Sequence, residues 1–226
     1  MFRALRYVFV GIVFMTTSNS YAQLEDKAKQ QKVEQKIFDQ LKQTTEIYSS
    51  DTGLYAKFKR TQILSLLGET ENAKGELYYS KKRLRLDLNS KDKSMVLITP
   101  NEIWNVSYED GKPQNIIKSK PVPMPLLDLL FGDKNVWDKF QITNIHTNTE
   151  SRIDVTLVPK RDAGVSYVSR VRFNLDTKKN IVKKLVYWDD VDNETSLTFT
   201  FNKFKDKMDE SLFKFHPPKE ATVTVM

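Results

Sequence analysis

Apolar and polar residues alternate most regularly between Gly75 and Asp110. Leu84, Leu86 and Leu88 are separated by charged residues, and similar alternation recurs further along the segment. A period of two residues places one side of a strand against a core or a ligand and the other side in water. The pattern therefore predicts three antiparallel strands in succession, at 77–88, 95–98 and 103–108, followed by a tight hairpin at Asp110-Gly111.

The segment 24–48 has a different period, which predicts the one long helix of the chain. Val33, Ile37 and Leu41 follow one another at a spacing of four residues, and Glu and Lys occupy the other positions. This spacing is typical of a helix that buries one apolar stripe. Ser49 to Gly53 is expected to end the helix.

Beyond the helix, short apolar runs predict further strands, and a proline-rich segment interrupts them. Three prolines between 121 and 125 mark a rigid turn, because proline cannot continue a central strand. The apolar run 126–131, closed by Gly132, predicts a short helix. The further strands are expected near 55–67, 116–117, 137–145, 152–159, 167–175, 181–188 and 197–201. With about ten to eleven strands and few helices, the fold class is antiparallel α+β.

Residues 1–22 have the features of a secretory signal. Arg3 and Arg6 precede an apolar run, and Ser20 and Ala22 are small residues at the cleavage positions. We expect cleavage after about Ala22, which leaves 23–226 as a single exported domain. An uncleaved anchor is the alternative, although the run is short for a membrane span.

Charge and cysteine content narrow the function classes. The chain of 226 residues carries a formal charge of +7; two of its 36 basic residues lie in the signal, so the mature chain carries +5. Its lysines are interspersed with acidic residues, which is typical of a solvated surface. The absence of cysteine excludes disulfides, thiolate chemistry and a lipidated cysteine anchor.

No pattern in the chain predicts catalysis. The two histidines, His146 and His216, are far apart and have no metal-ligand spacing, and the acidic run 189–194 lacks the glycine and glutamate of a calcium loop. We therefore expect a protein that is not an enzyme and holds no cofactor or metal. Export argues against nucleic acid as the partner of the basic cluster at 81–85. That cluster suits a solvated edge, lipid headgroups or a protein partner.

Several separated segments resemble, in order, the motifs of the outer-membrane lipoprotein carrier, the LolA family. The similar segments are Tyr55 to Gln62, Gly75 to Leu77, Ile103-Trp104, Pro125 to Leu130, Val155 to Lys160, Leu185 to Phe201 and Phe213 to Pro218. Together they span nearly all of the mature chain. The resemblance implies an unclosed antiparallel β half-barrel with a helical lid.

The same resemblance implies a function. It implies a monomeric periplasmic carrier that shields the acyl chains of lipoproteins in an apolar cavity. The carrier would receive them from an inner-membrane ABC lipoprotein-releasing transporter and pass them to an outer-membrane acceptor. The alternative is a periplasmic sensor or binding protein of the same fold without a shuttle role. A periplasmic hydrolase is a third interpretation, disfavoured by the missing triad.

The resemblance also implies which residues line the cavity. They are Val33, Ile37 and Leu41 from the long helix, Leu84, Leu86, Trp104 and Phe173 from the sheet, and Leu126, Leu127 and Leu130 from the short lid. The family's R-P-x-x-F-x-W strand is not present after Gly75. Lys81 or Lys82 stands where its lid-latching arginine would be. Asn193 replaces a hairpin glycine, at a position expected to need a positive φ.

Overall fold

A computed structural model describes residues 8–49, 53–89, 93–121, 129–132, 134–165 and 168–226, and the side chains of the first helix from 25 on, residue 26 excepted. The chain divides into two units, one ending at Gln40 and the other beginning at Leu41. The helix α1 (Val8–Ser49) belongs to both units. It begins well before the segment 24–48 that the sequence pattern predicts, so helical structure continues into the predicted signal.

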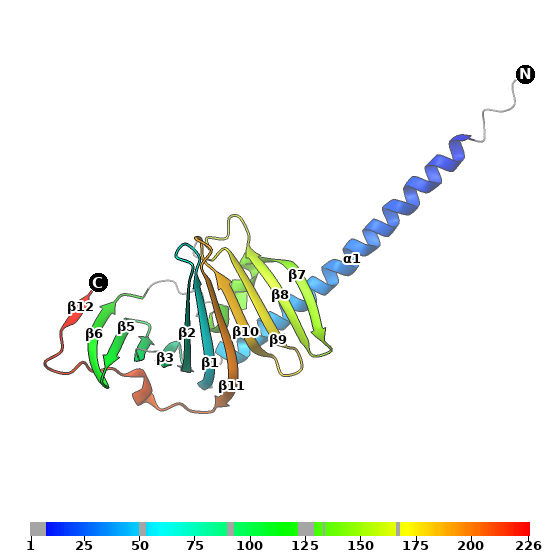
Figure 1. The fold of residues 1–226 in the computed structure, drawn as a ribbon. Helices are drawn as coiled ribbons and strands as arrows, with labels where there is room; N and C mark the ends of the chain where they lie inside the picture. Colours follow the sequence, from blue (N-terminus) through cyan, green and yellow to red (C-terminus); the bar gives the residue numbers. More distant parts are fainter. Residues whose placement is uncertain (1–7, 50–52, 90–92, 122–128, 133, 166–167) are drawn as a thin grey trace, which may run out of the picture. The chain divides into compact units, whose positions relative to one another are not determined.

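Twelve strands of the second unit form one open sheet (Figure 1). In chain order they are β1 (Gly53–Leu64), β2 (Glu69–Ser80), β3 (Arg83–Asn89), β4 (Lys93–Ile98), β5 (Ile103–Glu109), β6 (Lys112–Ser119), β7 (Phe140–Thr149), β8 (Arg152–Pro159), β9 (Arg170–Asp176), β10 (Ile181–Trp188), β11 (Glu194–Lys205) and β12 (Val223–Val225). Their order in the sheet is β12-β6-β5-β4-β3-β2-β1-β11-β10-β9-β8-β7. All neighbours are antiparallel except β12, which runs parallel to β6. The expected α+β fold with an unclosed antiparallel sheet is confirmed.

The expected strand 77–88 is wrong in one respect, because it is two strands. β2 and β3 are joined by a turn at Lys81 and Lys82, whose φ angles are +51° and +61°. A two-residue hairpin with positive φ at both positions usually contains Asn-Gly or Asp-Gly. Two lysines do not signal such a turn, so the sequence pattern continues through it as one strand.

Two further expectations differ from the structure. The segment 69–74, which lies between the expected strands 55–67 and 77–88, is the first half of β2, and its polar residues pair with the end of β1. Trp137, expected at the start of a strand, lies in the 3-10 helix η1 (Lys134–Lys139), which precedes β7. The hairpin at Asp110-Gly111 is confirmed, with φ of +50° and +77°. In the β10–β11 turn the positive φ falls on Asp192, not on Asn193.

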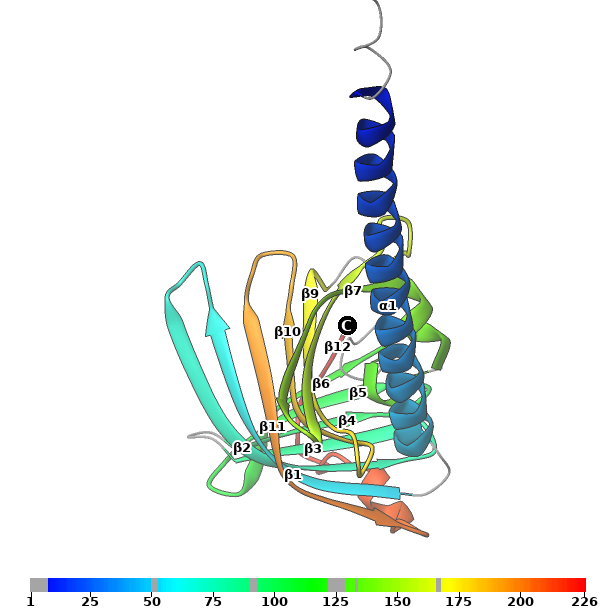
Figure 2. The ribbon, with the colours of Figure 1, turned by 90° about the vertical axis from the view of Figure 1, so that its right-hand side faces the viewer.

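The sheet has two faces that the pairing register separates. We call the side of Leu77, Tyr79 and Leu84 the inner face, and the side of Tyr78 and Arg85 the outer face, since Tyr79 pairs with Leu84 and Tyr78 with Arg85. The strands β3 to β6 run at a steep angle to β8 to β10, so the sheet is strongly twisted (Figure 2).

The C-terminal segment covers part of the outer face. Met208 lies just before the 3-10 helix η2 (Glu210–Phe213), and Phe213 is the last residue of that helix. Both pack with buried side chains from three strands. Those side chains are Met95, Leu97, Trp104, Val106 and Ile116. Arg83 forms an ion pair with Glu210 of η2, and its guanidinium lies 4.7 Å from the centre of the Phe213 ring. This cluster of apolar side chains on the outer face, together with the ion pair, therefore attaches the C-terminal segment to β3–β6.

Candidate functional site

The inner face is apolar across most strands of the sheet. Its residues follow from the register of each neighbouring pair of strands, and those over the middle of the sheet are buried. They include Val155, Phe173, Leu185, Leu197, Phe199, Phe58, Ala56, Leu54, Leu77, Tyr79, Leu84 and Ile98. A continuous apolar surface of this kind must be covered by other apolar groups to leave water.

The last turns of α1 provide part of that cover. Tyr48 is 1% exposed; its hydroxyl oxygen accepts hydrogen bonds from the Val182 backbone N–H at 3.1 Å and from Asn202 Nδ2 at 3.2 Å. Burial raises the pKa of Tyr48 well above its usual value, so this phenol stays neutral. The hydrogen bonds fix the end of the helix over β10 and β11.

Trp137 of η1 joins the helix to the sheet from another direction. Its indole Nε1 donates to Thr45 Oγ1 at 2.8 Å, and its ring meets the Phe173 ring edge-on at 5.2 Å between centroids. Trp137 is 1% exposed. An ion pair of 2.9 Å between Lys42 and Asp138 connects the same two elements at the surface. The end of α1 and η1 are therefore joined to each other, and η1 packs on β9 of the sheet.

The residues Leu129–Phe131 are helical and fill the space beside these elements. The Phe131 ring stacks on the Tyr79 ring at 3.9 Å with an interplanar angle of 15°, and Leu129 and Leu130 are each 2% exposed. The interior bounded by Leu41, Leu130 and Phe173 has an empty volume of about 180 Å³ and no room for a water molecule. Around these three residues, the described side chains fill the space over the apolar face.

The inner face extends beyond this packed region onto β3, β4 and β6. Leu86 pairs with Val96, and across β5 Asn105 pairs with Ile117. Leu86, Val96 and Ile117 are half-buried, and Asn105 is exposed. Apolar side chains of the same face therefore meet solvent at this end of the sheet.

The structure brings together several of the residues expected to line a cavity. Leu41, Leu84, Leu130 and Phe173 are each 2% exposed or less, and Leu86 is half-buried on the same face. In the first unit, Ile37 is 8% exposed and Val33 is 50% exposed. Leu126 and Leu127 lie outside the described residues. The cavity assignment of the described residues remains a prediction.

Trp104 does not share this surface. It pairs with Leu97 on the outer face, where its ring meets the Phe215 ring at 5.3 Å between centroids. Its indole Nε1 donates to Glu102 Oε1 at 2.8 Å. Neighbouring apolar residues Ile103 and Trp104 are both buried, on opposite faces, so alternation alone does not identify the face that the helix covers.

Lys81 and Lys82, the expected lid latch, are exposed in the β2–β3 turn, and their latch role stays a prediction. The hydrogen bonds described above connect Tyr48 of α1 to the sheet and Thr45 of α1 to Trp137 of η1. These residues, with Trp137 and Phe131, were not among the expected site residues. Tyr48 belongs to the apolar stripe of the helix, and this position in the sequence pattern could have identified it as a residue of the cover.

The described residues offer little for metal binding or membrane spanning. Among them, no group of three or more His, Asp or Glu side chains is placed to hold a metal ion. Within the same described part of the chain, no helix combines the length and apolar character of a membrane span.

A family model decides the classification. The model described as "Outer membrane lipoprotein carrier protein LolA" matches residues 49–216, about three quarters of the chain. The chain belongs to the LolA family. Membership, together with the apolar inner face, supports a LolA-like role in binding lipid or lipoprotein and a periplasmic location. Proteins of this family are in general non-enzymatic binding proteins.

Solved structures are similar in fold at low sequence identity. An uncharacterized conserved protein from Thermus thermophilus is 14% identical with a TM-score of 0.52, over 83% of this chain and 98% of that one. A LolA superfamily protein from Nitrosomonas europaea is 8% identical with a TM-score of 0.39, over 80% and 97%. Pseudomonas aeruginosa MucB in its complex with MucA is 13% identical with a TM-score of 0.44, over 79% and 60%. No curated protein matches the chain.

Proposed function

We propose that the protein is a periplasmic carrier that shields the acyl chains of lipoproteins on its inner face and moves them from the inner membrane to the outer membrane. The observation that supports the proposal most is the match to the LolA family over 49–216 on a sheet with a continuous apolar face. The proposal includes a signal peptide cleaved after about Ala22. It also includes an inner-membrane ABC transporter as donor and an outer-membrane acceptor.

Acyl chains need such a cover because their exposure to water is strongly unfavourable. Each buried CH₂ group contributes about 0.8 kcal/mol. A carrier must nevertheless release its cargo, so the net free energy of binding has to be much smaller than the sum over methylenes. The packed interior beneath α1 suggests how this is achieved.

In the proposed mechanism the acyl chain replaces the protein's own apolar cover. Phe131 on Tyr79, and Leu129 and Leu130 beside them, occupy the surface that a chain would use. When they move away, the acyl chain takes their place and the amount of apolar surface in water changes little. The exchange then costs little in either direction, which suits loading and unloading.

The half-buried residues at one end of the inner face are the proposed point of entry. Leu86, Val96 and Ile117 present apolar surface to solvent where the described cover is incomplete. An acyl chain that first contacts these side chains has a continuous apolar path to Leu84 and Tyr79 on the same face. Displacement of Phe131 would follow from that contact.

A charge at the point of entry tests binding. Leu86→Glu places a carboxylate on the proposed path, and we expect binding of a fluorescent acylated peptide to the purified protein to fall at least about tenfold. Ile63→Glu is the matched control, because Ile63 is 37% exposed and pairs with Thr70 and Glu194 away from this path. Circular dichroism verifies that both variants fold. Undiminished binding by a folded Leu86→Glu protein refutes the assignment.

A transfer assay separates the carrier from a sensor of the same fold. Donor vesicles contain the acylated peptide, and the protein is added between them and acceptor vesicles. A carrier speeds transfer in proportion to its concentration, whereas a sensor binds the peptide without speeding transfer. Binding without transfer would therefore reject the shuttle and leave the binding role.

A further inference from the structure

The outer face contains a groove that the acyl-binding proposal does not use. It has a volume of about 650 Å³ and crosses β1 to β5, next to the core around Met95 and Phe213. Its charged side chains belong to the outer face, since Lys57 pairs with Glu76 and Glu76 with Asp87. A volume of this size is in the range of small-molecule sites.

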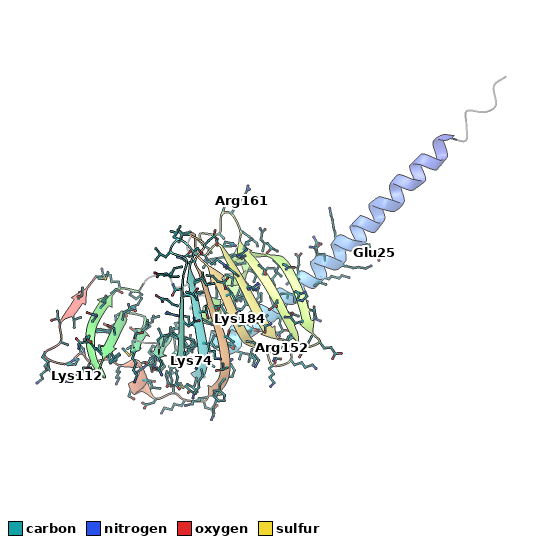
Figure 3. The ribbon with its side chains drawn as sticks, viewed as in Figure 1. Glu25, Lys74, Lys112, Arg152, Arg161 and Lys184 are labelled. Carbon is teal, nitrogen blue, oxygen red and sulfur yellow. The ribbon has the colours of Figure 1, made fainter. Side chains whose placement is uncertain are left out.

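The groove is strongly cationic. Its lining includes the five cations Lys57, Lys59, Lys74, Arg85 and Lys93, against two carboxylates, Glu76 and Asp87, which gives a formal charge of +3. Figure 3 shows Lys74 on β2, in the middle of the sheet. A concave cationic surface concentrates anions from solution.

Both carboxylates are already engaged within the groove. Glu76 Oε1 accepts from the Tyr55 hydroxyl at 2.7 Å, and Glu76 Oε2 accepts from the Tyr78 hydroxyl at 2.6 Å. The two oxygens of Asp87 accept from Arg85 Nε at 2.9 and 3.0 Å. Neither acid is therefore in a position to neutralise the remaining lysines without losing these bonds.

Lys57 forms an ion pair with Glu76 at 3.6 Å. The other three lysines lie in one row across the sheet. Lys59 pairs directly with Lys74, Lys74 with Asn89, and Asn89 with Lys93. Among the described residues, no hydrogen bond or ion pair engages these three ammonium groups. Like charges directly opposite each other on neighbouring strands are destabilising, so the Lys59–Lys74 pair costs stability unless an anion lies between its members.

Protection of a sheet edge does not account for these lysines. Exposed lysines commonly prevent edge strands from pairing with other chains. The strands β1 to β4 have neighbours on both sides in the twelve-stranded order, so the row lies far from either edge. A ligand with several negative charges is the explanation that fits their position.

The wall of the groove indicates the second property of the ligand. Tyr108 is half-buried, and Met95 beneath it is 2% exposed, so one side of the groove is apolar. From β1 to β4 the row spans three inter-strand distances, about 14 Å at the usual spacing. Ammonium groups on flexible stems are common phosphate ligands.

We propose that this groove binds a phosphate-bearing amphiphile through Lys59, Lys74 and Lys93, with the apolar part of the ligand against Tyr108 and Met95. An acidic peptide fits less well, because sheets bind extended peptides along an edge strand and this groove lies on a face. The site is on the opposite side of the sheet from the proposed acyl path. The two proposals therefore succeed or fail independently.

Calorimetric titration with two phosphate probes tests the site and its source of phosphate. The probes are inorganic pyrophosphate and vesicles of phosphatidylcholine with or without phosphatidic acid. Binding of phosphatidic acid vesicles, with or without binding of pyrophosphate, supports a phosphate-bearing amphiphile. Binding confined to pyrophosphate assigns the lysines to free phosphate and overturns the apolar part of the proposal. No binding of either probe at low ionic strength overturns the proposal, as does binding confined to an acidic peptide.

A triple variant shows whether the row is responsible. Lys59→Gln, Lys74→Gln and Lys93→Gln together should reduce probe binding roughly tenfold or more, because each removes a charged hydrogen-bond donor. The matched control removes three exposed lysines elsewhere, with Lys178→Gln, Lys179→Gln and Lys219→Gln, and should bind as the parent does. Equal losses in both triple variants would mean that only net charge matters and would overturn the site.

Thermal unfolding provides a readout that does not depend on the titration. The probe that binds in the titration should raise the Tm of the parent protein and of the Leu86→Glu variant, and should leave the Tm of the row variant unchanged. A shift of the same size in the row variant contradicts the assignment.

Discussion

The two faces of the sheet are covered by different segments of the sequence, and the chemistry of the two covers differs. On the inner face, the end of α1 and η1 attach through ring packing and neutral hydrogen bonds such as Trp137 to Thr45. On the outer face, Met208 and Phe213 attach the C-terminal segment through apolar packing, and charged groups add to it, with an ion pair between Arg83 and Glu210 and Arg85 Nη1 donating to the Leu212 carbonyl oxygen at 3.3 Å.

The difference teaches which cover can be exchanged for a lipid. Apolar contacts on the inner face lose little when another apolar group replaces them, whereas no acyl chain replaces the charged contacts on the outer face. Partly exposed ion pairs are weakened by salt, and buried ring contacts are not. The inner cover is therefore suited to displacement and the outer cover to permanent attachment.

Removal of the largest ring in the inner cover should have the largest effect. Trp137→Ala eliminates a side chain that is 1% exposed, with its contact to Phe173, and should lower the free energy of unfolding by about 3–5 kcal/mol. Denaturant titration measures the loss. Trp104→Ala, on the outer face, should also destabilise the protein, but only Trp137→Ala should increase the uptake of a fluorescent fatty acid. Equal uptake by both variants would remove the distinction between the faces.

Gly75 tests how closely the inner face is packed over β2. A Cβ at this position would lie 2.5 Å from the Asp87 carbonyl oxygen and 2.8 Å from Phe58 Cζ. Because one of these atoms is backbone, Gly75→Ala should lower the free energy of unfolding by about 1–3 kcal/mol. Ser94→Ala, nearby on β4, is the control and should change it by less than about 0.5 kcal/mol. A neutral Gly75→Ala would show that β2 and β3 are more loosely packed.

Titration of Glu76 should give a smaller, pH-dependent effect on the outer face. Hydrogen bonds from Tyr78 and Tyr55 lower the pKa of Glu76 below its usual 4.5. A carboxyl with a lowered folded-state pKa stabilises the fold above its unfolded pKa, and this contribution is lost as the pH falls through the lowered value. Because the side chain is 39% exposed, we expect less than about 1 kcal/mol.

The same cluster should respond at high pH. Burial, together with its hydrogen bond to Glu76, raises the pKa of Tyr55 to about 12, so stability should decline as the pH rises from 10 towards 12. Urea unfolding across pH 3–12 measures the loss of stability at acid pH and the loss at alkaline pH. Glu76→Gln should make the loss of stability at acid pH smaller, and Glu109→Gln on β5 should leave it unchanged. An acid-side loss of the same size in Glu76→Gln would assign it to other carboxyls, such as Glu102 and Asp154, whose pKa values are also lowered.

The smallest expected effect is a gain. Lys74→Gln removes the like-charge pair with Lys59 and should raise the free energy of unfolding of the unliganded protein by a few tenths of a kcal/mol. The gain should shrink in high salt, since screening already weakens the repulsion. Lys178→Gln, in the β9–β10 turn, should give no gain. A loss of stability in Lys74→Gln would argue that the lysine has a structural partner.

The sequence predicts the fold class because local periodicity and turn residues determine much of this sheet. Alternation at Leu84, Leu86 and Leu88 places them on one face, and Asp110-Gly111 forms the expected hairpin. The turn at Lys81-Lys82 is not predicted, since lysines carry no preference for positive φ. The turn follows from the pairing of β2 with β3, because Ser80 pairs with Arg83 and leaves only Lys81 and Lys82 between them.

The candidate site is predicted less completely, because it depends on which face is covered. Leu41 of α1 and Phe173 of β9 are both buried, and their role in lining a cavity stays a prediction. Trp104 is also aromatic and buried, but the register places it among outer-face residues that the C-terminal segment covers. The sequence pattern predicts Trp137 as a strand residue, and only its contacts with α1 show its role in the cover.

The parallel pairing of β12 with β6 has a consequence for the order of assembly. Val223 to Val225 pair with Ile116 to Lys118, more than a hundred residues earlier in the chain. During synthesis, the backbone groups at the β6 edge of the β3–β6 meander stay unpaired until β12 is made. A fusion or truncation after Phe215 would leave β6 as an unpaired edge strand, to which strands of other molecules could pair.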